Sequence, residues 1–271
     1  MKDILVFADG RPDCLAAIQV AAQLAHPFQA RLTAALEGAV TEVPAMALHA
    51  GGMMLADDLA EQRDRLREEI QAKVASLLAP LRESVEWVMM ADRSVEALAH
   101  LSIFTDLAVM TFGDEFVTPN ALAQFVIHSG RPVLVVPAGH PGTAVGKRVT
   151  IGWGGGRESS RAVHDALPLL RAAEAVELVI VTAAKNEPTG VQPGHTIAAH
   201  LARHGVAATV RLVTGDLGPG VDGALLAAAA DHQSDMIVMG AFGAGRLREA
   251  LLGGVTKSVL RNTRIPIYLS H

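Results

Sequence analysis

The stretch MGAFGAGRLREALLGGVTKSVL, residues 239–260, carries the clearest signal of fold and function in this chain. It begins at the end of a short apolar run, MIVM, which has the pattern of a buried strand. Gly240 and Gly243 open a loop, and Gly253 and Gly254 close it before a helix-like stretch. A strand, a glycine loop and a helix start are a common setting for phosphate, which backbone N–H groups hold. The stretch therefore predicts an α/β fold that binds a nucleotide.

Composition narrows the class of protein. The chain has 271 residues, of which 50% are hydrophobic and 19% charged, and its net charge is −5. This predicts a substantial core, and the lack of a Lys/Arg cluster argues against a nucleic-acid partner. No apolar run approaches the ~20 residues of a membrane span, and the start, MKDILVFADG, enters a strand pattern without a signal peptide. We therefore expect a cytoplasmic protein with no membrane partner.

The single cysteine agrees with a reducing compartment. With Cys14 alone, an intramolecular disulfide is impossible. Cys14 lies at the start of an amphipathic helix pattern and has no obvious His partner. We interpret it as a small packing residue rather than a redox group.

The chain is an internal repeat, because five strand-like segments of the first half recur in the same order in the second. The matched segments are 4–10 with 149–155, 31–36 with 177–183, 85–90 with 207–213, 106–110 with 235–239, and 132–136 with 266–270. Helix patterns at 14–25 and 159–172 follow the first strand of each half. The strands are almost continuously apolar, which is typical of a parallel sheet covered on both faces.

These patterns predict two tandem doubly wound α/β domains, each with a five-stranded parallel sheet in the order 3-2-1-4-5. Residues 138–147 (AGHPGTAVGK) are rich in Gly and Pro and serve as the linker. The domains are therefore expected at 1–138 and 147–271. Their final strands, Val133 to Val136 and Ile267 to Leu269, are apolar edges that we expect to pair with each other.

The first half carries an insert at about residues 38–80. Its part from Asp57 to Leu78 is charged and periodic, with Leu59, Leu66, Ile70, Val74 and Leu77 on one face. This pattern predicts an amphipathic helix that lies on the sheet.

The glycine loop distinguishes the two halves. Pro132 follows Asp106 by 26 positions, whereas Pro266 follows Asp235 by 31. The first half therefore lacks five residues where the second has its glycines, and residues 111–125 keep only Gly113. If one half binds phosphate, it is the second.

The order of the strands predicts where a ligand lies. In a doubly wound sheet, ligands bind outside the carboxyl ends of the strands where the strand order reverses. In the second half that point is between the strands that end at Trp153-Gly154 and Met239-Gly240. The start of the next helix then offers N–H groups and a dipole that favour an anion.

The glycine spacing resembles that of a known family. Gly240, two residues, Gly243, nine residues and Gly253 look like the nucleotide loop of universal stress proteins, and VMG before the loop and VLRNTRIPIYLS after it are similar too. The resemblance covers both halves, so the chain resembles a tandem universal stress protein with two UspA-like domains. It implies a flavodoxin-like fold of the adenine nucleotide alpha hydrolase type. It also implies bound ATP or AMP, perhaps with Mg.

The resemblance implies a set of contacts made largely by backbone atoms. The residues are Trp153, Gly154, Ala183, Met239, Gly240, Gly243, Gly253, Gly254, Val255 and Thr256. Two positions depart from the family pattern. Gly254 stands where a Ser or Thr is usual, with Thr256 close enough to compensate, and Gly154 stands where an Asp contacts adenine. The first half keeps that residue as Asp9 but lacks the loop, so neither half has a complete site.

Other motifs carry less weight. Residues 152–157 fail the dinucleotide fingerprint because Arg157 replaces its last glycine, and residues 142–148 fail the Walker spacing. His195, His200 and His204 lack a carboxylate or Cys at ligand spacing, so we expect solvated helix residues and no metal site. Arg246 and Arg248 are expected on a solvated loop face, and Glu249 is a weak candidate for a catalytic base.

The sequence thus favours a stress-response protein that binds adenine nucleotide in its second half as a signal, with no catalytic residues. Two alternatives stay open. One is a slow nucleotide hydrolase or transferase on the same fold, and the other is a ligand-free interaction module. The sequence also leaves further association into a homodimer open.

Overall fold

A computed structural model describes residues 1–8, 12–36, 52–79, 85–90, 94–112, 117–143, 145–183, 194–215, 218, 220–241 and 254–271. The first half contains β1 (Asp3–Ala8), α1 (Pro12–Phe28), β2 (Arg31–Leu36), α2 (Gly52–Leu77), β3 (Val85–Met89), α3 (Val95–Ser102), β4 (Leu107–Phe112), α4 (Pro119–Ser129) and β5 (Val133–Pro137). The second half contains β6 (Arg148–Gly152), α5 (Arg157–Ala172), β7 (Ala175–Ala183), α6 (His195–Arg203), β8 (Ala208–Gly215), α7 (Gly220–Asp231), β9 (Met236–Gly240), α8 (Gly254–Asn262) and β10 (Ile267–Ser270).

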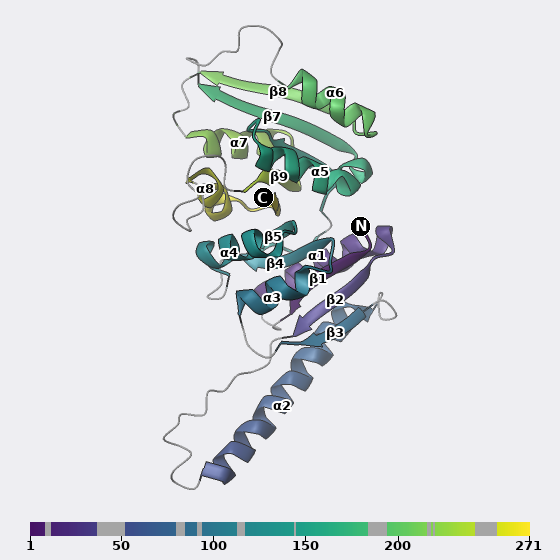
Figure 1. The fold of residues 1–271 in the computed structure, drawn as a ribbon, viewed down its shortest axis with the longest axis vertical. Helices are drawn as coiled ribbons and strands as arrows, with labels where there is room; N and C mark the ends of the chain where they lie inside the picture. The colour runs from purple at the N-terminus through teal and green to yellow at the C-terminus, as the bar shows by residue number, and fades with distance from the viewer. Residues whose placement is uncertain are drawn as a thin grey trace.

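The strands form a single ten-stranded sheet in the order β3-β2-β1-β4-β5-β10-β9-β6-β7-β8. Each half has the predicted 3-2-1-4-5 order with parallel neighbours, so the predicted fold class is confirmed. The one antiparallel pair is β5 with β10, where Leu134 lies opposite Tyr268. The two final strands pair with each other, as their apolar edges predict. They join the sheets of the two halves edge to edge (Figure 1).

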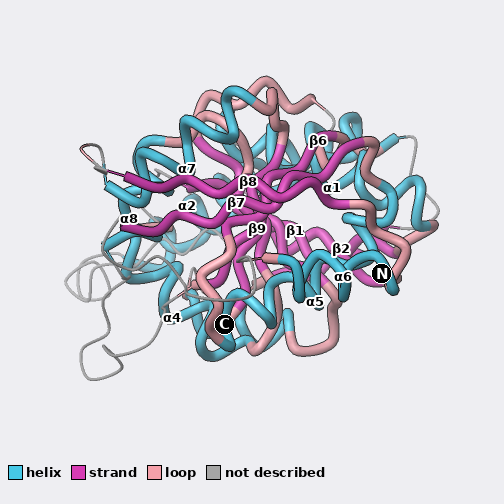
Figure 2. Tube along the Cα trace, turned by 90° about the horizontal axis from the view of Figure 1, so that it is seen from above, coloured by secondary structure: helices cyan, strands magenta, loops and turns pink. Residues whose placement is uncertain are grey.

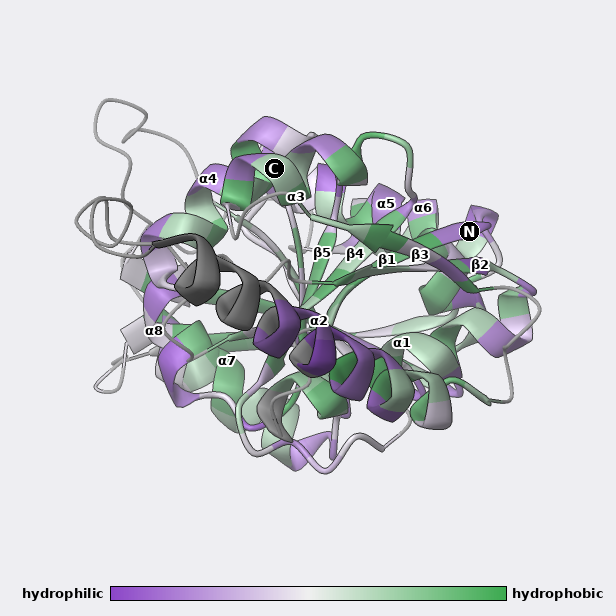
Figure 3. Cartoon of the chain, turned by 90° about the horizontal axis from the view of Figure 1, so that it is seen from below, coloured by the Kyte–Doolittle hydropathy of each residue, from purple (hydrophilic) through white to green (hydrophobic). Residues whose placement is uncertain are grey.

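Helices cover both faces of this sheet (Figure 2). Every residue of β4 and β5 is buried, as an apolar strand between two helical layers requires. The strands are green between more hydrophilic helices in Figure 3. Cys14 belongs to this core, since it is 3% exposed and its Sγ lies 2.7 Å from the carbonyl oxygen of Phe7, which supports its interpretation as a packing residue.

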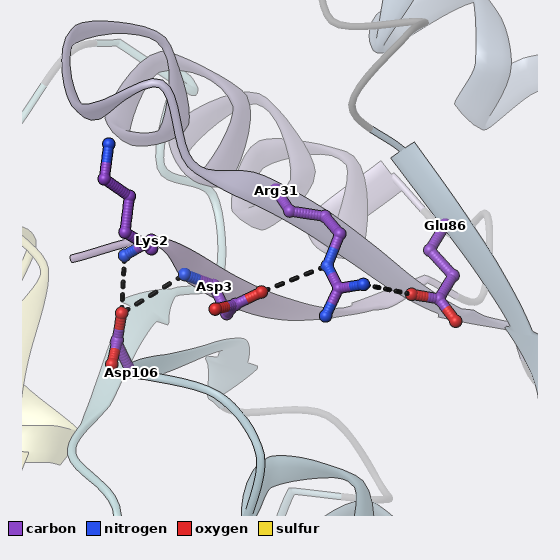
Figure 4. Close-up of polar contacts among 5 residues, drawn as sticks. All are labelled: Lys2, Asp3, Arg31, Glu86 and Asp106. Atoms are coloured by element: carbon purple, nitrogen blue, oxygen red, sulfur yellow. Dashed lines mark hydrogen bonds and ion pairs between the residues drawn. The ribbon is translucent and has the colours of Figure 1, made fainter.

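The same arrangement of hydrogen bonds, repeated in both halves, holds the amino ends of the strands. In the first half, the Asp106 carboxylate accepts hydrogen bonds from the backbone N–H groups of Lys2 and Asp3 (Figure 4). Arg31 then pairs with Asp3 at 3.0 Å and with Glu86 at 3.3 Å. These ion pairs are exposed and contribute little, whereas bonds from backbone to a carboxylate are stronger.

The second half repeats this device with Asp235. Its carboxylate accepts from the N–H groups of Gly146, Lys147 and Arg148 at 2.9–3.2 Å. In both halves an aspartate just before the fourth strand therefore holds the start of the first strand. These bonds occupy the amino edge of the sheet in each half. We therefore expect groups that can bind a ligand at the carboxyl edge.

The linker packs against both halves. Gln23 of α1 donates from Nε2 to the carbonyl oxygen of Gly142 at 2.7 Å, and Val145 is 8% exposed. Gly142 has a φ of +71°, and a Cβ there would lie 2.0 Å from Oε1 of Gln19. The positive φ at residue 142 favours glycine, and any side chain there would also require Gln19 to move aside.

The insert helix differs from the prediction. α2 is helical as expected. Among the side chains that the structure describes, those that reach the core lie at its C-terminal end, at Val74 and at Leu78 just after the helix, which are at most 1% exposed. Glu61, Asp64 and Glu68 are exposed, and α2 extends beyond the sheet (Figure 1). The expectation that the helix lies along the sheet is therefore wrong for most of its length. Its polar residues outnumber its apolar ones, so burial along the whole helix would bring charged side chains out of water.

Candidate functional site

The predicted ligand position lies at the carboxyl ends of β6 and β9. These strands are neighbours, with Gly152 beside Met239, and β10 pairs with β9 so that Ser270 lies beside Gly240. From β6 the chain proceeds to β7 on one side, whereas β9 lies on the other. The strand order therefore reverses between β6 and β9, as the sequence predicts.

Gly240 has a packing reason to be glycine. A Cβ at this position would lie 2.5 Å from the carbonyl carbon of Glu158 and 2.5 Å from the backbone nitrogen of Ser159. The first turn of α5 therefore rests directly on the end of β9. From the sequence we interpreted Gly240 as a ligand-binding glycine. The close contact between α5 and β9 explains why this residue is glycine without any ligand.

Glu158 occupies the start of α5. It is 5% exposed, and its Oε1 accepts from Nε of Arg157 at 2.8 Å. That hydrogen bond, a bond from the helix backbone and the charges of Arg157 and His271 lower the pKa of Glu158, although burial opposes the shift. An ionised carboxylate of the chain itself thus neutralises this helix start, and a phosphate there would meet like charge.

The start of α8 is different. Gly254 is exposed, a Cβ there would meet no described residue within 4 Å, and the first turn of α8 contains no acidic residue. Val255 is 37% exposed, whereas Thr256 is 4% exposed and faces the protein interior. The backbone of 254–255 is therefore the part of this helix start that is open to an anion.

The equivalent helix of the first half, α4, is already capped. The side chain of Thr118 accepts from the N–H of Ala121, and Pro119 at the first helical position has no N–H. Two of the groups that would hold a phosphate are thus unavailable at α4. This agrees with the expectation that the second half is the one that binds.

The other predicted residues lie at the rim of this position. Trp153 directly follows β6, is partly buried, and donates its backbone N–H to the carbonyl oxygen of Val179 at 2.9 Å. Gly154 is exposed with open space around it, and Ala183 ends β7. Gly243 and Gly253, with Asp9, Gly113, Arg246, Arg248 and Glu249, lie outside the described residues.

Several polar residues beside the site were missed by sequence reasoning. Asp165 of α5 pairs with Arg161 at 2.8 Å and accepts from the Ser270 hydroxyl at 2.6 Å. Nδ1 of His271 lies 3.0 Å from the carbonyl oxygen of Ala241. The only signal for these contacts was that α5 and the last strand both reach the carboxyl edge.

The expectation of solvated helix histidines holds for His195, which is exposed, but His200 and His204 are partly buried. The ring centroid of His200 lies 5.0 Å from that of His164 in α5 and 4.6 Å from that of His204. Nε2 of His200 is buried. Spacing along one helix could not reveal a partner that comes from another helix.

In the part of the chain that the structure describes, no group of three or more His, Cys, Asp or Glu side chains is arranged to hold a metal ion. Nor is any helix there both long and apolar enough to cross a membrane.

Comparison with known proteins agrees with this architecture. The model of the Universal stress protein family matches residues 146–271, so the second half contains a domain of that family. No curated protein matches the sequence.

Solved structures extend the likeness to the whole chain. A universal stress protein from Archaeoglobus fulgidus DSM 4304 is similar with a TM-score of 0.71 at 15% identity, over 99% of this chain and 95% of that one. A protein of unknown function from Pseudomonas aeruginosa PAO1 is similar with a TM-score of 0.60 at 16% identity, over 100% and 92%. At these identities the likeness shows the fold, and it shows it for both halves.

Proposed function

We propose that the chain is a tandem universal stress protein, with domains at about 1–138 and 147–271, whose second domain binds ATP or AMP as a signal. The observation that carries this proposal is the difference between the helix starts around the site. α5 begins with its own buried carboxylate, Glu158, and α4 begins with a Thr-Pro cap. α8 begins with the exposed, unobstructed Gly254.

The position of Gly254 supports a nucleotide rather than a free anion. α8 follows β9, whose end lies beside the end of β6 at the point where the strand order reverses. Phosphates at the N–H groups of α8 would leave the rest of the ligand near Trp153 and Gly154. The open space at Gly154 leaves room there for a base or sugar.

A role in signalling fits this set of residues better than turnover. Glu158 is held by Arg157, and Asp165 by Arg161 and Ser270, so both carboxylates are committed to structural contacts. Neither is free to act as a general base or to bind a metal.

The test is nucleotide binding by a pair of variants at one position. Gly254→Glu and Gly254→Gln add side chains of nearly equal size where no atom obstructs them. A carboxylate at the helix start would repel phosphate, so we expect Gly254→Glu to weaken MgATP binding at least about tenfold relative to Gly254→Gln. Calorimetry measures both affinities, and thermal melting shows whether both variants fold.

Nucleotide released on denaturation gives an independent reading. Adenine nucleotide recovered from the purified protein supports the proposal. An empty protein whose melting temperature does not change in millimolar MgATP or AMP overturns it and leaves the ligand-free interaction module. Steady release of ADP would instead identify the hydrolase.

A further inference from the structure

Three histidines from two helices lie together away from the nucleotide position. The ring centroid of His200 is 5.0 Å from that of His164 and 4.6 Å from that of His204, and the rings of His164 and His204 are 6.1 Å apart. His164 lies in the middle of α5, and the other two lie at the end of α6. We call these three residues the histidine cluster.

The ring of His200, which lies between the other two, has a buried nitrogen, Nε2, that makes no hydrogen bond. Burial, the neighbouring His204 and His164, and then Arg203 all lower the pKa of His200. Every charged group in that set is a base, so no counter-charge favours the protonated imidazole.

The surroundings add positive charge rather than balance it. Arg171 of α5 donates from Nε to the carbonyl oxygen of His204 at 2.7 Å, and its Nη2 lies 3.4 Å from Nδ1 of His204. At the opposite end of α6, Gly194 lies against the apolar side chains of Ile180, Val210 and Leu178. The charged groups identified beside the cluster are bases from α5 and α6.

α6 depends on few contacts. Of its nine residues, Leu201 is the one that is fully buried, and Ile197 is partly buried against the core. The helix is therefore anchored by two apolar side chains together with its histidine contacts to α5. An unfavourable change at the cluster would act on a helix with little other packing to hold it.

We propose that the histidine cluster is a pH-sensitive latch, which holds α6 against α5 while the His200 imidazole is neutral and releases it when acid protonates that ring. The protonated ring of His200 would lie with its centroid 5.0 Å from that of His164 and 4.6 Å from that of His204, with Arg203 as a further base nearby, so no counter-charge in this group would favour it.

The sign of the effect follows from His200. Its pKa is lower in the closed state than the usual 6.5, so the open state binds the proton more tightly. The closed contact is therefore complete above about pH 6.5 and weakens as pH falls below that value. Opening would uncover the apolar surface at Val210, which is already 38% exposed.

Hydrogen exchange of the full chain tests the latch. We expect the protection of α6 amides, corrected for intrinsic rates, to fall roughly tenfold between about pH 7.5 and about pH 5.5, while α7 amides change little. His200→Gln cannot be protonated, so its α6 protection should be the same at both pH values. His195→Gln, at an exposed position of the same helix, should keep the response of the unmodified chain.

His164→Gln gives a second reading that spares the buried position, since His164 is exposed. It should reduce the pH response and leave α6 folded even if His200→Gln does not fold. Equal α6 protection at both pH values in the unmodified chain would overturn the proposal. So would a pH response that survives undiminished in both the His200→Gln and His164→Gln variants.

Discussion

At the scale of single residues, the glycines that looked alike in the sequence have different causes. Gly240 is required by the first turn of α5, which leaves no space for a Cβ. Gly142 has a positive φ and lies against Gln19. A Cβ at Gly154 or Gly254 would meet no described residue within 4 Å, so packing against the described part of the chain does not require glycine at either position.

This difference predicts the effect of adding one methyl group. Gly240→Ala places a Cβ 2.5 Å from backbone atoms of Glu158 and Ser159, which are fixed in a helix and cannot rotate away. We expect a loss of roughly 1–3 kcal/mol in the free energy of unfolding, measured by urea denaturation. Gly154→Ala is the matched control and should change stability by less than about 0.5 kcal/mol. Equal stability of the two variants would contradict this account.

At the scale of elements, the ends of helices decide what each can bind. α3 and α4 have Ser94 and Thr118 as caps, and both side chains accept from a backbone N–H of the first turn. α5 begins at Arg157 after Gly156, which has no side chain to accept such a bond, and Glu158 supplies the negative charge instead. A helix start whose backbone N–H groups or positive charge are already matched by the protein's own side chains is not available to an anion.

The charge at the start of α5 predicts a pH dependence. The pKa of Glu158 lies below its usual 4.5 in the folded state, so its ionised form stabilises the fold above that value. That contribution is lost as pH falls through the folded pKa. Glu158→Gln should lower the free energy of unfolding by about 0.5–1 kcal/mol near neutral pH. Urea denaturation should show the gap closing below about pH 4, and a gap independent of pH would rule out the charge as its cause.

At the scale of the whole molecule, the two halves share one sheet. Ile267, Tyr268 and Leu269 of β10 are at most 2% exposed, and the edge of β10 that faces away from β9 is paired with β5. A strand edge of this kind is a template for pairing when it is uncovered. The tandem chain therefore supplies internally the partner that a single domain would need from another copy.

Separating the halves tests this role. A fragment of residues 146–271 would expose the β10 edge, and we expect it to associate with itself in light scattering at micromolar concentration. Addition of a fragment of residues 1–138 should convert it to a one-to-one complex, because β5 is the native partner. A monomeric 146–271 fragment that ignores the other half would show that β10 does not drive the contact.

The sequence by itself determined the strands, their order and the pairing of the final strands. Continuous apolar runs and a repeated pattern depend on local burial, which the residue types of β1, β4, β6 and β9 record directly. It also indicated the carboxyl edge of the second half, since that position follows from strand order alone.

Only the tertiary structure decided what residues distant in the chain do to one another. Glu158 against Gly240, His164 against His200 and Asp235 against Gly146 join separate elements. α2 likewise leaves the sheet along most of its length, although its apolar spacing suited a covering helix. Periodicity reports which face of an element is apolar, but the contacts that a face makes depend on the packing of other elements.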